Sequence, residues 1–586
     1  MMCTPVLKEN PITTEIIRNA FISIAREMNE SLFRSAYSPI IYEMKDCAVA
    51  IFDANLNPLG QSQGVPLFLG NLEETIKAAI DYYGGKEYFK PGDVYIMNDS
   101  YLTGTHLNDV TIFAPCYYEA LLVGFTATRA HWFDIGAKDA AYSIDSTSIF
   151  QEGLRLGPLK IINQGSPNQD LIDTICMNSR FPINAHGDMN AQIAACHTGE
   201  GRLKALIERF GYETLMNSAH DIFIQSQLLE EEVVSQIKEG EYYAEGFLDN
   251  DGATNNRVFV RVKITVKSGK ITVDLSDSST MAVGSTNCGK AQAIAAVRVA
   301  YKMITLPHAP VTGGSFKPLE VIVKPRTIFA AEEPAACTWY FSHLGLTIDL
   351  IIKALSDALP NNVAAAHYGD SMVMYLSGFN PKDGKLYAIS EPTLGGWGGT
   401  WCQDGGDCLI NVCNGDFKNL PVEVFESLYP MKINKLEIRR NSGGPGKFRG
   451  GNGLIKMFSS LAEEAHLRTW FERTQCPAWG VHGGKDGLPP EVTVNHGGKQ
   501  IAVGLEKVND FLIKKGWEVV IKTGGGGGYG NPLLRSPELV AKDVNQDYVS
   551  KEFAKTEYGV VLTYNGEVDQ HATQIERKKR LGFDKV

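Results

Sequence analysis

The alternation of apolar and polar residues predicts a run of helices and strands at the start of the chain. Residues 11–36 have helical spacing, with Thr13 or Thr14 as the expected N-cap, and their apolar face is formed by Ile16, Ile17, Ala20, Phe21, Ile24 and Ala25. An apolar run at 47–52, followed by Asp-Ala-Asn and then Leu59-Gly60, predicts a strand and a hairpin. We expect a second helix ending in Gly-Gly at 71–85, and further strands at 91–99, 109–118 and 121–136.

The rest of the chain changes character several times. The pattern is helical from about 165 to 240, and it predicts strands with an SGK hairpin turn over 240–280 and helices at 285–308 and 343–359. From 385 onward the chain is glycine-rich with short strands, and its tail is charged and partly helical. This pattern favours an α+β fold, a large multi-lobed chain with mixed, mostly antiparallel sheets and helical insertions. We expect five regions: 1–165, 166–240 (helical), 241–384 (central α+β), 385–535 (glycine-rich, β-rich) and a tail, 536–586.

Composition narrows the class of protein. A net charge of −11 over 586 residues argues against nucleic-acid binding, which would require a basic surface. The first residues are polar and no long apolar stretch follows, so we expect neither a secretory signal nor a membrane span. The chain has 11 cysteines without CxxC pairs, which predicts reduced thiols and a cytoplasmic location.

One short stretch, NDSYLTGTHLNDV (98–110), gathers candidate metal ligands where a strand is expected to begin. His106 and Asp109 lie three residues apart, His131 ends the next expected strand, and Asp46 begins an earlier one. Two imidazoles and two carboxylates suit a borderline divalent ion such as Zn²⁺ or Mn²⁺. An ion held there could polarise an amide or activate water.

Other interpretations remain open at this point. His-x-x-Asp is a short pattern, and aspartates are common in loops because they stabilise turns. Glu43 competes with Asp46 as a ligand, and the remaining acids of this region fit turn roles equally well: Asp53, Asp99 and Asp134.

The glycine runs and the other thiols and histidines give weaker signals. TGGGGGYG (523–530) and GGPGKFRGGNG (443–453) lack the Lys-Ser/Thr ending of a phosphate-binding loop, so close backbone packing is the expected role of their glycines. Cys402, Cys408, Cys413 and Cys476 lack zinc-ribbon spacing and are expected to be buried free thiols. The side chains of Cys196 and His197 should diverge on a helix. Four further histidines have no partner that the sequence can assign, and a structural role is expected for each: His186, His308, His343 and His482.

Several long motifs resemble the hydantoinase B/oxoprolinase family. They are GDVYIMNDSYLTGTHLNDV (92–110), TRAHWFDIG (128–136), IFQEGLRLGPLKI (149–161), NSGGPGKFRGGNG (441–453) and TGGGGGYGNP (523–532). The resemblance runs in order from about residue 11 to about residue 532, and only the tail lies outside it. Members of this family include N-methylhydantoin hydrolases, caprolactamase, 5-oxoprolinases and the related subunits of acetone and acetophenone carboxylases.

The resemblance implies a B-type subunit of an ATP-dependent complex, a heterotetramer or larger. A hydantoinase A-type ATPase partner would phosphorylate a small cyclic amide, and this chain would hydrolyse the activated product. In the related carboxylases a divalent metal is held by Asp, His, Asp and His, which fall here on Asp46, His106, Asp109 and His131. Asp99 or Asp134, not bound to the metal, would then orient the attacking water as catalytic residues. A ketone carboxylase using the same site is the alternative.

Overall fold

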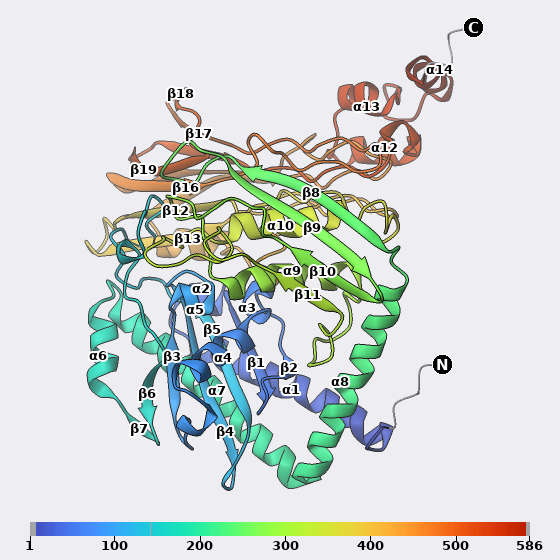
Figure 1. Cartoon of the computed structure of the whole chain (residues 1–586). Coiled ribbons are helices and arrows are strands. Elements are labelled where there is room, and N and C mark those ends of the chain that lie inside the picture. The colour runs from blue at the N-terminus through green and yellow to red at the C-terminus, as the bar shows by residue number, and fades with distance from the viewer. Residues whose placement is uncertain (1–6, 141, 582–586) are drawn as a thin grey trace.

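The computed structural model describes residues 7–140 and 142–581 and contains four sheets. Figure 1 shows an N-terminal sheet with its helices, a central sheet beside α9 and α10, the C-terminal sheets, and a small helical module at the C-terminal end. Every named strand pair is antiparallel except β10 with β11. The expected α+β class with mostly antiparallel sheets is therefore confirmed.

The N-terminal sheet has seven strands. In spatial order they are β2 (Pro58–Gln61), β1 (Cys47–Asp53), β5 (Leu121–His131), β4 (Asp109–Tyr118), β3 (Val94–Met97), β6 (Leu159–Asn163) and β7 (Ser166–Pro167). Strand β5 lies between β1 and β4, and its last residue, His131, pairs with Asp109 of β4. On its other side Ala130 pairs with Cys47 of β1. The expected ligands therefore lie together at one end of three neighbouring strands: Asp109 begins β4, His131 ends β5, and Asp46 immediately precedes β1.

Both faces of this sheet are covered, because its strands are apolar on both sides. Val49 and Ile51 of β1 pack with α1 (Pro11–Ser35) and α7 (Pro182–Phe210), whereas Ala50 and Phe52 pack with α4 (Leu72–Tyr82). The start of α1 differs from the prediction: Asn10, not Thr13 or Thr14, is the N-cap and accepts the N–H of Ile12. Ile16, expected on the buried face, is 47% exposed.

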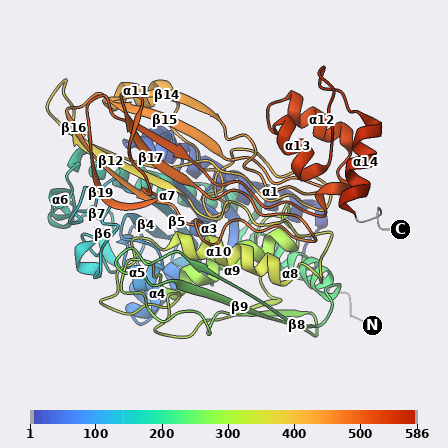
Figure 2. The same ribbon diagram turned by 90° about the horizontal axis from the view of Figure 1, so that it is seen from above.

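The chain then rises along α8 (Tyr212–Ser235) into the central four-stranded sheet (Figure 1). Its order is β11 (Leu319–Ile322), β10 (Lys270–Asp274), β9 (Val258–Lys267) and β8 (Gly240–Leu248). One face of the sheet is covered by α10 (Phe341–Ala354), which also packs against α9 (Lys290–Ile304). Figure 2, seen from above, shows α9 and α10 side by side near the middle of the molecule.

Two C-terminal sheets follow. The four-stranded sheet orders β13 (Leu386–Pro392), β12 (Val373–Phe379), β16 (Glu464–Trp470) and β19 (Lys507–Lys514). The five-stranded sheet orders β14 (Met431–Ile438), β15 (Leu454–Ser460), β20 (Glu518–Lys522), β17 (Glu491–His496) and β18 (Lys499–Ala502). The expected division into five regions stays a prediction, and the β12–β13 hairpin spans its boundary at 384–385.

Short helices complete the fold. The N-terminal half holds α2 (Pro39–Tyr42), α3 (Pro66–Leu69), α5 (Ser100–Thr103), α6 (Gln169–Met177), η1 (Lys86–Tyr88) and η2 (Ile149–Gln151). The C-terminal half holds α11 (Val422–Leu428), η3 (Pro532–Leu534), α12 (Pro537–Asn545), α13 (Lys551–Tyr558) and α14 (Gln570–Arg580). Within residues 7–140 and 142–581, no helix combines the length and apolar character needed to cross a membrane.

The glycine runs pack against one another, as expected. Successive N–H groups of Gly525–Gly528 donate to carbonyl oxygens of Leu488, Gly451, Ala366 and Lys485, at 2.8–3.0 Å. The segment is therefore surrounded by several backbone segments rather than paired with one strand. A Cβ added at Gly526 would lie 2.1 Å from the carbonyl oxygen of Trp397, so only glycine fits there.

Candidate metal centre

His106, Asp109 and His131 lie together at one end of the N-terminal sheet, where β4 begins and β5 ends. His106 lies in the turn that joins α5 to β4, and Gly104 before it has a left-handed φ of +88°. A side chain at Gly104 would also meet the backbone nitrogen of Gln292 at 2.5 Å, so this turn requires glycine. Asp109 and His131 are direct cross-strand neighbours of β4 and β5.

The three side chains converge on one point. His106 Nε2 lies 2.9 Å from Asp109 Oδ1 and 3.1 Å from His131 Nδ1, and His131 Nδ1 lies 3.0 Å from Asp109 Oδ1. All three residues are buried. Their ligand-capable atoms lie within 4.8 Å of one another, a spacing suited to a single ion.

The hydrogen-bond partner of His106 determines its tautomer. Its Nδ1 lies 3.0 Å from the carbonyl oxygen of Thr338, which can only accept, so Nδ1 carries the hydrogen. The lone pair of a neutral His106 then points from Nε2 toward Asp109 and His131. If both imidazoles are neutral, the three converging atoms, His106 Nε2, His131 Nδ1 and Asp109 Oδ1, carry at most one hydrogen between them. At least two of these atoms are therefore hydrogen-bond acceptors that face each other. A cation among them would satisfy all three atoms.

The ionisation of Asp109 and that of the two histidines depend on one another. Burial opposes ionisation of Asp109, but the charge and hydrogen bonds that His106 and His131 supply when protonated outweigh it and lower the pKa of this carboxyl. Burial lowers the pKa of His131, against the effect of Asp109, so this imidazole is neutral near pH 7. A carboxylate and neutral imidazoles are the protonation states that metal ligands require.

Two buried tyrosines contact the same side chains, and no pattern in the sequence points to either. The hydroxyl of Tyr340 donates to Asp109 Oδ2 at 2.8 Å. The hydroxyl of Tyr142 lies 2.6 Å from His131 Nε2, and its ring stacks on that imidazole. Tyr340 is distant in sequence from Asp109, so only the tertiary fold brings the two together.

Asp46 lies beside the centre but outside the closest group. It precedes β1, and its carbonyl oxygen accepts the N–H of His131 at 3.0 Å. Its side chain lines the same cavity as the other three, whereas Glu43 does not. Burial, and then the charge of Asp109, raise the pKa of Asp46 well above its usual range. A bound divalent cation would reverse that shift, because it would favour the carboxylate.

The two aspartates expected to orient water have other partners. Asp99 is the N-cap of α5, where it accepts the N–H of Tyr101 and pairs with Arg155 at 3.5 Å. Asp134 accepts from the backbone and guanidinium of Arg180, at 2.6 and 2.7 Å. Within the described residues neither carboxylate contacts His106, Asp109 or His131.

The centre opens into a small cavity of about 40 Å³. It is walled by side chains from three parts of the chain, among them Phe68, Tyr142, Phe341, Tyr375 and Phe417. A water needs roughly 10–15 Å³ by this measure, so there is room for an ion and a water but little else. The walls combine these aromatic rings with polar side chains, and the burial of the three converging residues strengthens electrostatic interactions among them.

The remaining histidines and thiols lie elsewhere. His343 is buried against Cys288, and His186 is bonded to Asn190 on the exposed side of α7. All ten cysteines in the described part of the chain are free. The expectation of burial holds for Cys413 but is wrong for Cys402, which is exposed because it lies on a loop at the rim of another cavity.

Comparison with known proteins identifies the family. The profile of the hydantoinase B/oxoprolinase family matches residues 10–532. The chain belongs to this family. It is 30% identical to the B-type subunit of a putative D-/L-hydantoinase from Pseudomonas sp. strain NS671, over 98% of this chain and 99% of that protein. It is 28% identical to the beta chain of the caprolactamase from Pseudomonas jessenii, over 97% of this chain and 99% of that one.

Solved structures give the same architecture. The crystal structure of the ATP-dependent caprolactamase from Pseudomonas jessenii superposes with a TM-score of 0.91 at 26% identity, over 97% of this chain and 100% of that chain. A nucleotide-free acetone carboxylase structure superposes with a TM-score of 0.89 at 20% identity, over 99% of this chain and 84% of that one. The second likeness concerns the fold alone.

Proposed function

We propose that this chain is the metal-dependent catalytic subunit of an ATP-dependent hydrolase of cyclic amides. The observation that carries the proposal is the convergence of the buried side chains of His106, Asp109 and His131 at a small cavity. Similarity over nearly the whole length to the B-type hydantoinase subunit and to the beta chain of caprolactamase supports the choice of substrate class, a hydantoin, a lactam or 5-oxoproline.

The residues present fit a divalent metal, because their converging acceptor atoms lack the hydrogens to satisfy one another. His106, Asp109 and His131 would hold it, with Asp46 as the proposed fourth ligand. Two nitrogen and two oxygen donors suit Zn²⁺ and Mn²⁺ alike. When bound, such an ion would supply Lewis acidity at the point where the carbonyl carbon of the substrate is attacked.

Neighbouring groups of the protein hold the proposed ligands in position before any metal binds. The carbonyl of Thr338 holds the imidazole of His106 in one tautomer, and the hydroxyl of Tyr340 holds the carboxylate of Asp109 in one plane. The hydroxyl of Tyr142 lies 2.6 Å from His131 Nε2, where it would hold this imidazole in place. We assign to Tyr142 a positioning role beside the centre, where the sequence had suggested Asp99 and Asp134.

The proposal includes a partner subunit. An unactivated amide is a poor electrophile, and the relatives named as ATP-dependent or as subunits make ATP the natural source of activation. A hydantoinase A-type ATPase would phosphorylate the amide oxygen, and this chain would hydrolyse the product at the proposed metal centre. The isolated chain should then show no ATP hydrolysis, and steady turnover of ATP by it alone would contradict this division of labour.

Metal analysis tests the centre directly. The purified chain is expected to hold one Zn²⁺ or Mn²⁺, and His106→Ala and His131→Ala are expected to lose it. His186→Ala, an exposed histidine on α7, is the matched control and should keep the metal. Unchanged stoichiometry in both site variants would refute the proposed metal centre.

Reconstitution with the ATPase partner tests the reaction. Hydantoin, 5-oxoproline or caprolactam with ATP should give a ring-opened product, and His106→Ala should abolish it. The ketone carboxylase alternative requires acetone or acetophenone with ATP and bicarbonate instead. Product formation only with ketone and bicarbonate would rule out the hydrolase.

A further inference from the structure

A second, larger cavity lies on the far side of residues 412–413 from the metal centre. Its volume is about 640 Å³, within the range of roughly 300–1,000 Å³ that is usual for small-molecule sites. Val412 lines this cavity, its neighbour Cys413 lines the metal cavity, and no described residue lines both. We call it the His367 cavity. Its walls come from the end of α9, from α10, and from the segments 362–367 and 397–412.

One buried polar atom in the wall lacks a partner. His367 is 4% exposed, and its Nδ1 lies 2.7 Å from Asp349 Oδ1. Since a carboxylate only accepts, Nδ1 carries the hydrogen and Nε2 presents a lone pair. In the described part of the chain Nε2 has no hydrogen-bond partner. A buried acceptor without a partner is energetically unfavourable, so it usually marks the place of a ligand or a water.

Arg473 makes this arrangement electrically neutral. Its guanidinium donates to Asp349 Oδ2, the oxygen that His367 leaves free, and it lies 4.8 Å from the ring centre of Trp479. The charges of Asp349 and Arg473 cancel each other. With its Nδ1–H directed to Asp349, His367 has Nε2 placed to accept a hydrogen bond.

The rest of the wall selects against charge. Among the described residues no lysine or arginine lines the cavity, and its two acids are neutralised elsewhere: Asp349 by Arg473, and Asp404 by Arg535. Trp397 and Trp401 supply flat apolar surfaces. An anion such as a phosphate would find no counter-charge here, whereas a flat neutral molecule would find stacking surfaces and one acceptor.

We propose that the His367 cavity is a second binding site, for a small, planar, uncharged molecule that donates an N–H or O–H to His367 Nε2. Carboxamides, lactams and ureides are the chemical class that fits. The site is separate from the metal centre, and its occupation does not require a metal.

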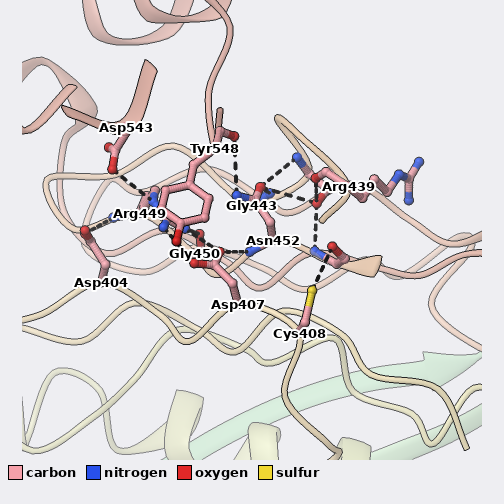
Figure 3. Close-up of polar contacts among 12 residues, drawn as sticks. Asp404, Asp407, Cys408, Arg439, Gly443, Arg449, Gly450, Asn452, Asp543 and Tyr548 are labelled. Atoms are coloured by element: carbon pink, nitrogen blue, oxygen red, sulfur yellow. Dashed lines mark hydrogen bonds and ion pairs between the residues drawn. The ribbon is translucent and has the colours of Figure 1, made fainter. Parts of the chain in front are cut away.

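The part of the wall around Asp404 is held in place by hydrogen bonds and ion pairs. Asp404 accepts the backbone N–H of Arg449 at 2.8 Å and two N–H groups of Arg535 at 2.6 and 2.7 Å. Arg449 in turn holds Asp407 with two hydrogen bonds and pairs with Asp543 of the C-terminal module (Figure 3). Because these links fasten residues 404–407 to buried arginines, the cavity is preformed, as small-molecule sites usually are.

Binding of 2-pyrrolidone, measured by ligand-observed NMR titration in the presence of a chelator, tests the proposal. 2-Pyrrolidone donates an N–H, and 1-methyl-2-pyrrolidone has the same flat ring without the donor. We expect saturable binding of 2-pyrrolidone and about tenfold weaker binding of the methylated ring, the effect of one hydrogen bond of about 1.4 kcal/mol. His367→Ala should weaken 2-pyrrolidone about tenfold and leave the methylated ring unchanged.

Two control variants locate the effect. His308→Ala makes the same substitution elsewhere in the cavity wall, and Asp109→Ala disables the metal centre. Both should bind 2-pyrrolidone like the unaltered chain. The absence of saturable binding, equal binding of the two rings by the unaltered chain, or loss of binding in Asp109→Ala would each overturn the proposal. The comparison of 2-pyrrolidone with 1-methyl-2-pyrrolidone uses the unaltered chain, so it tests the proposal even if His367→Ala does not fold.

Discussion

The hydroxyl of Tyr340 offers the sharpest test of the proposed metal centre, because it can be removed without changing the shape of the side chain. Tyr340 is 4% exposed and donates to Asp109 Oδ2 at 2.8 Å, while Oδ1 of the same carboxylate faces both histidines. Tyr340→Phe leaves the ring in place and frees the carboxylate to rotate.

The size of the effect follows from these contacts. In the described part of the chain the Tyr340 hydroxyl is the one side-chain donor to Asp109 Oδ2, so nothing replaces it. Groups that orient a metal ligand in this way typically contribute about 10–100-fold to metal affinity, or about 1.4–2.7 kcal/mol. Tyr340→Phe should therefore raise the dissociation constant for Zn²⁺ or Mn²⁺ by that factor.

Competition with a fluorescent chelator gives the dissociation constant. Tyr375→Phe is the matched control, because Tyr375 is also buried and lines the same cavity, and within the described residues no hydrogen bond joins it to the three converging side chains. It should leave the affinity within about twofold, the scatter usual for a change of a few tenths of a kcal/mol. Equal affinities for Tyr340→Phe and the unaltered chain would refute the assignment of Asp109 as a ligand fixed by Tyr340.

Three further predictions concern the fold. Gly526→Ala should prevent folding, because the added Cβ would lie 2.1 Å from a backbone carbonyl oxygen. Gly524→Ala is the control and should fold, because the nearest atom to its Cβ would be Met372 Cε at 3.2 Å. Equal yields of folded protein from the two variants would contradict the packing argument. Burial lowers the pKa of His343 to about 3, so the folded state binds fewer protons than the unfolded state, and the free energy of unfolding falls as the pH drops below 6.5. This one histidine should contribute a slope of about 1.4 kcal/mol per pH unit to urea unfolding at pH 5–6, and His343→Gln should lose that slope. Parallel pH profiles of the two proteins would contradict the prediction. Arg535→Gln should remove one of the two buried arginines that hold Asp404 and Asp543, and destabilise the C-terminal module by about 3 kcal/mol. Proteolysis at 536–581 should then be faster than in Arg580→Gln, which should match the unaltered chain.

Periodicity predicted most of the elements but not their ends. The N-cap of α1 was misplaced because Asn10 and the two threonines are all good caps, and Pro11 at the first helical position decides between them. Ile16 faces solvent because it lies on the side of α1 opposite to the buried residues Thr14, Ile17 and Phe21. The apolar pattern of the sequence made the predicted buried face wider than the face that its neighbours cover.

The candidate centre was predictable where its residues are local and unpredictable where they are not. His106 and Asp109 lie in one turn, and His131 ends the neighbouring strand, so the hairpin brings them together. Tyr340 and Thr338 reach the centre from the segment just before α10, and no spacing rule connects them with residues 106–109. Asp99 and Asp134 looked eligible because a sequence does not show that Tyr101, Arg155 and Arg180 already satisfy them.

One irregularity in the β4–β5 hairpin determines whether a centre can exist at all. Near the turn Tyr118 pairs with Leu121, and with regular pairing from there Asp109 would lie opposite Ala130. A bulge between Cys116 and Tyr117 shifts the register by one residue, so that Asp109 lies opposite His131. Because side chains alternate between faces, a one-residue slip would turn His131 to the other side of the sheet. The bulge therefore places both side chains on the face that Tyr340 and Thr338 approach. A substitution that removes the bulge should abolish metal binding while the sheet still forms.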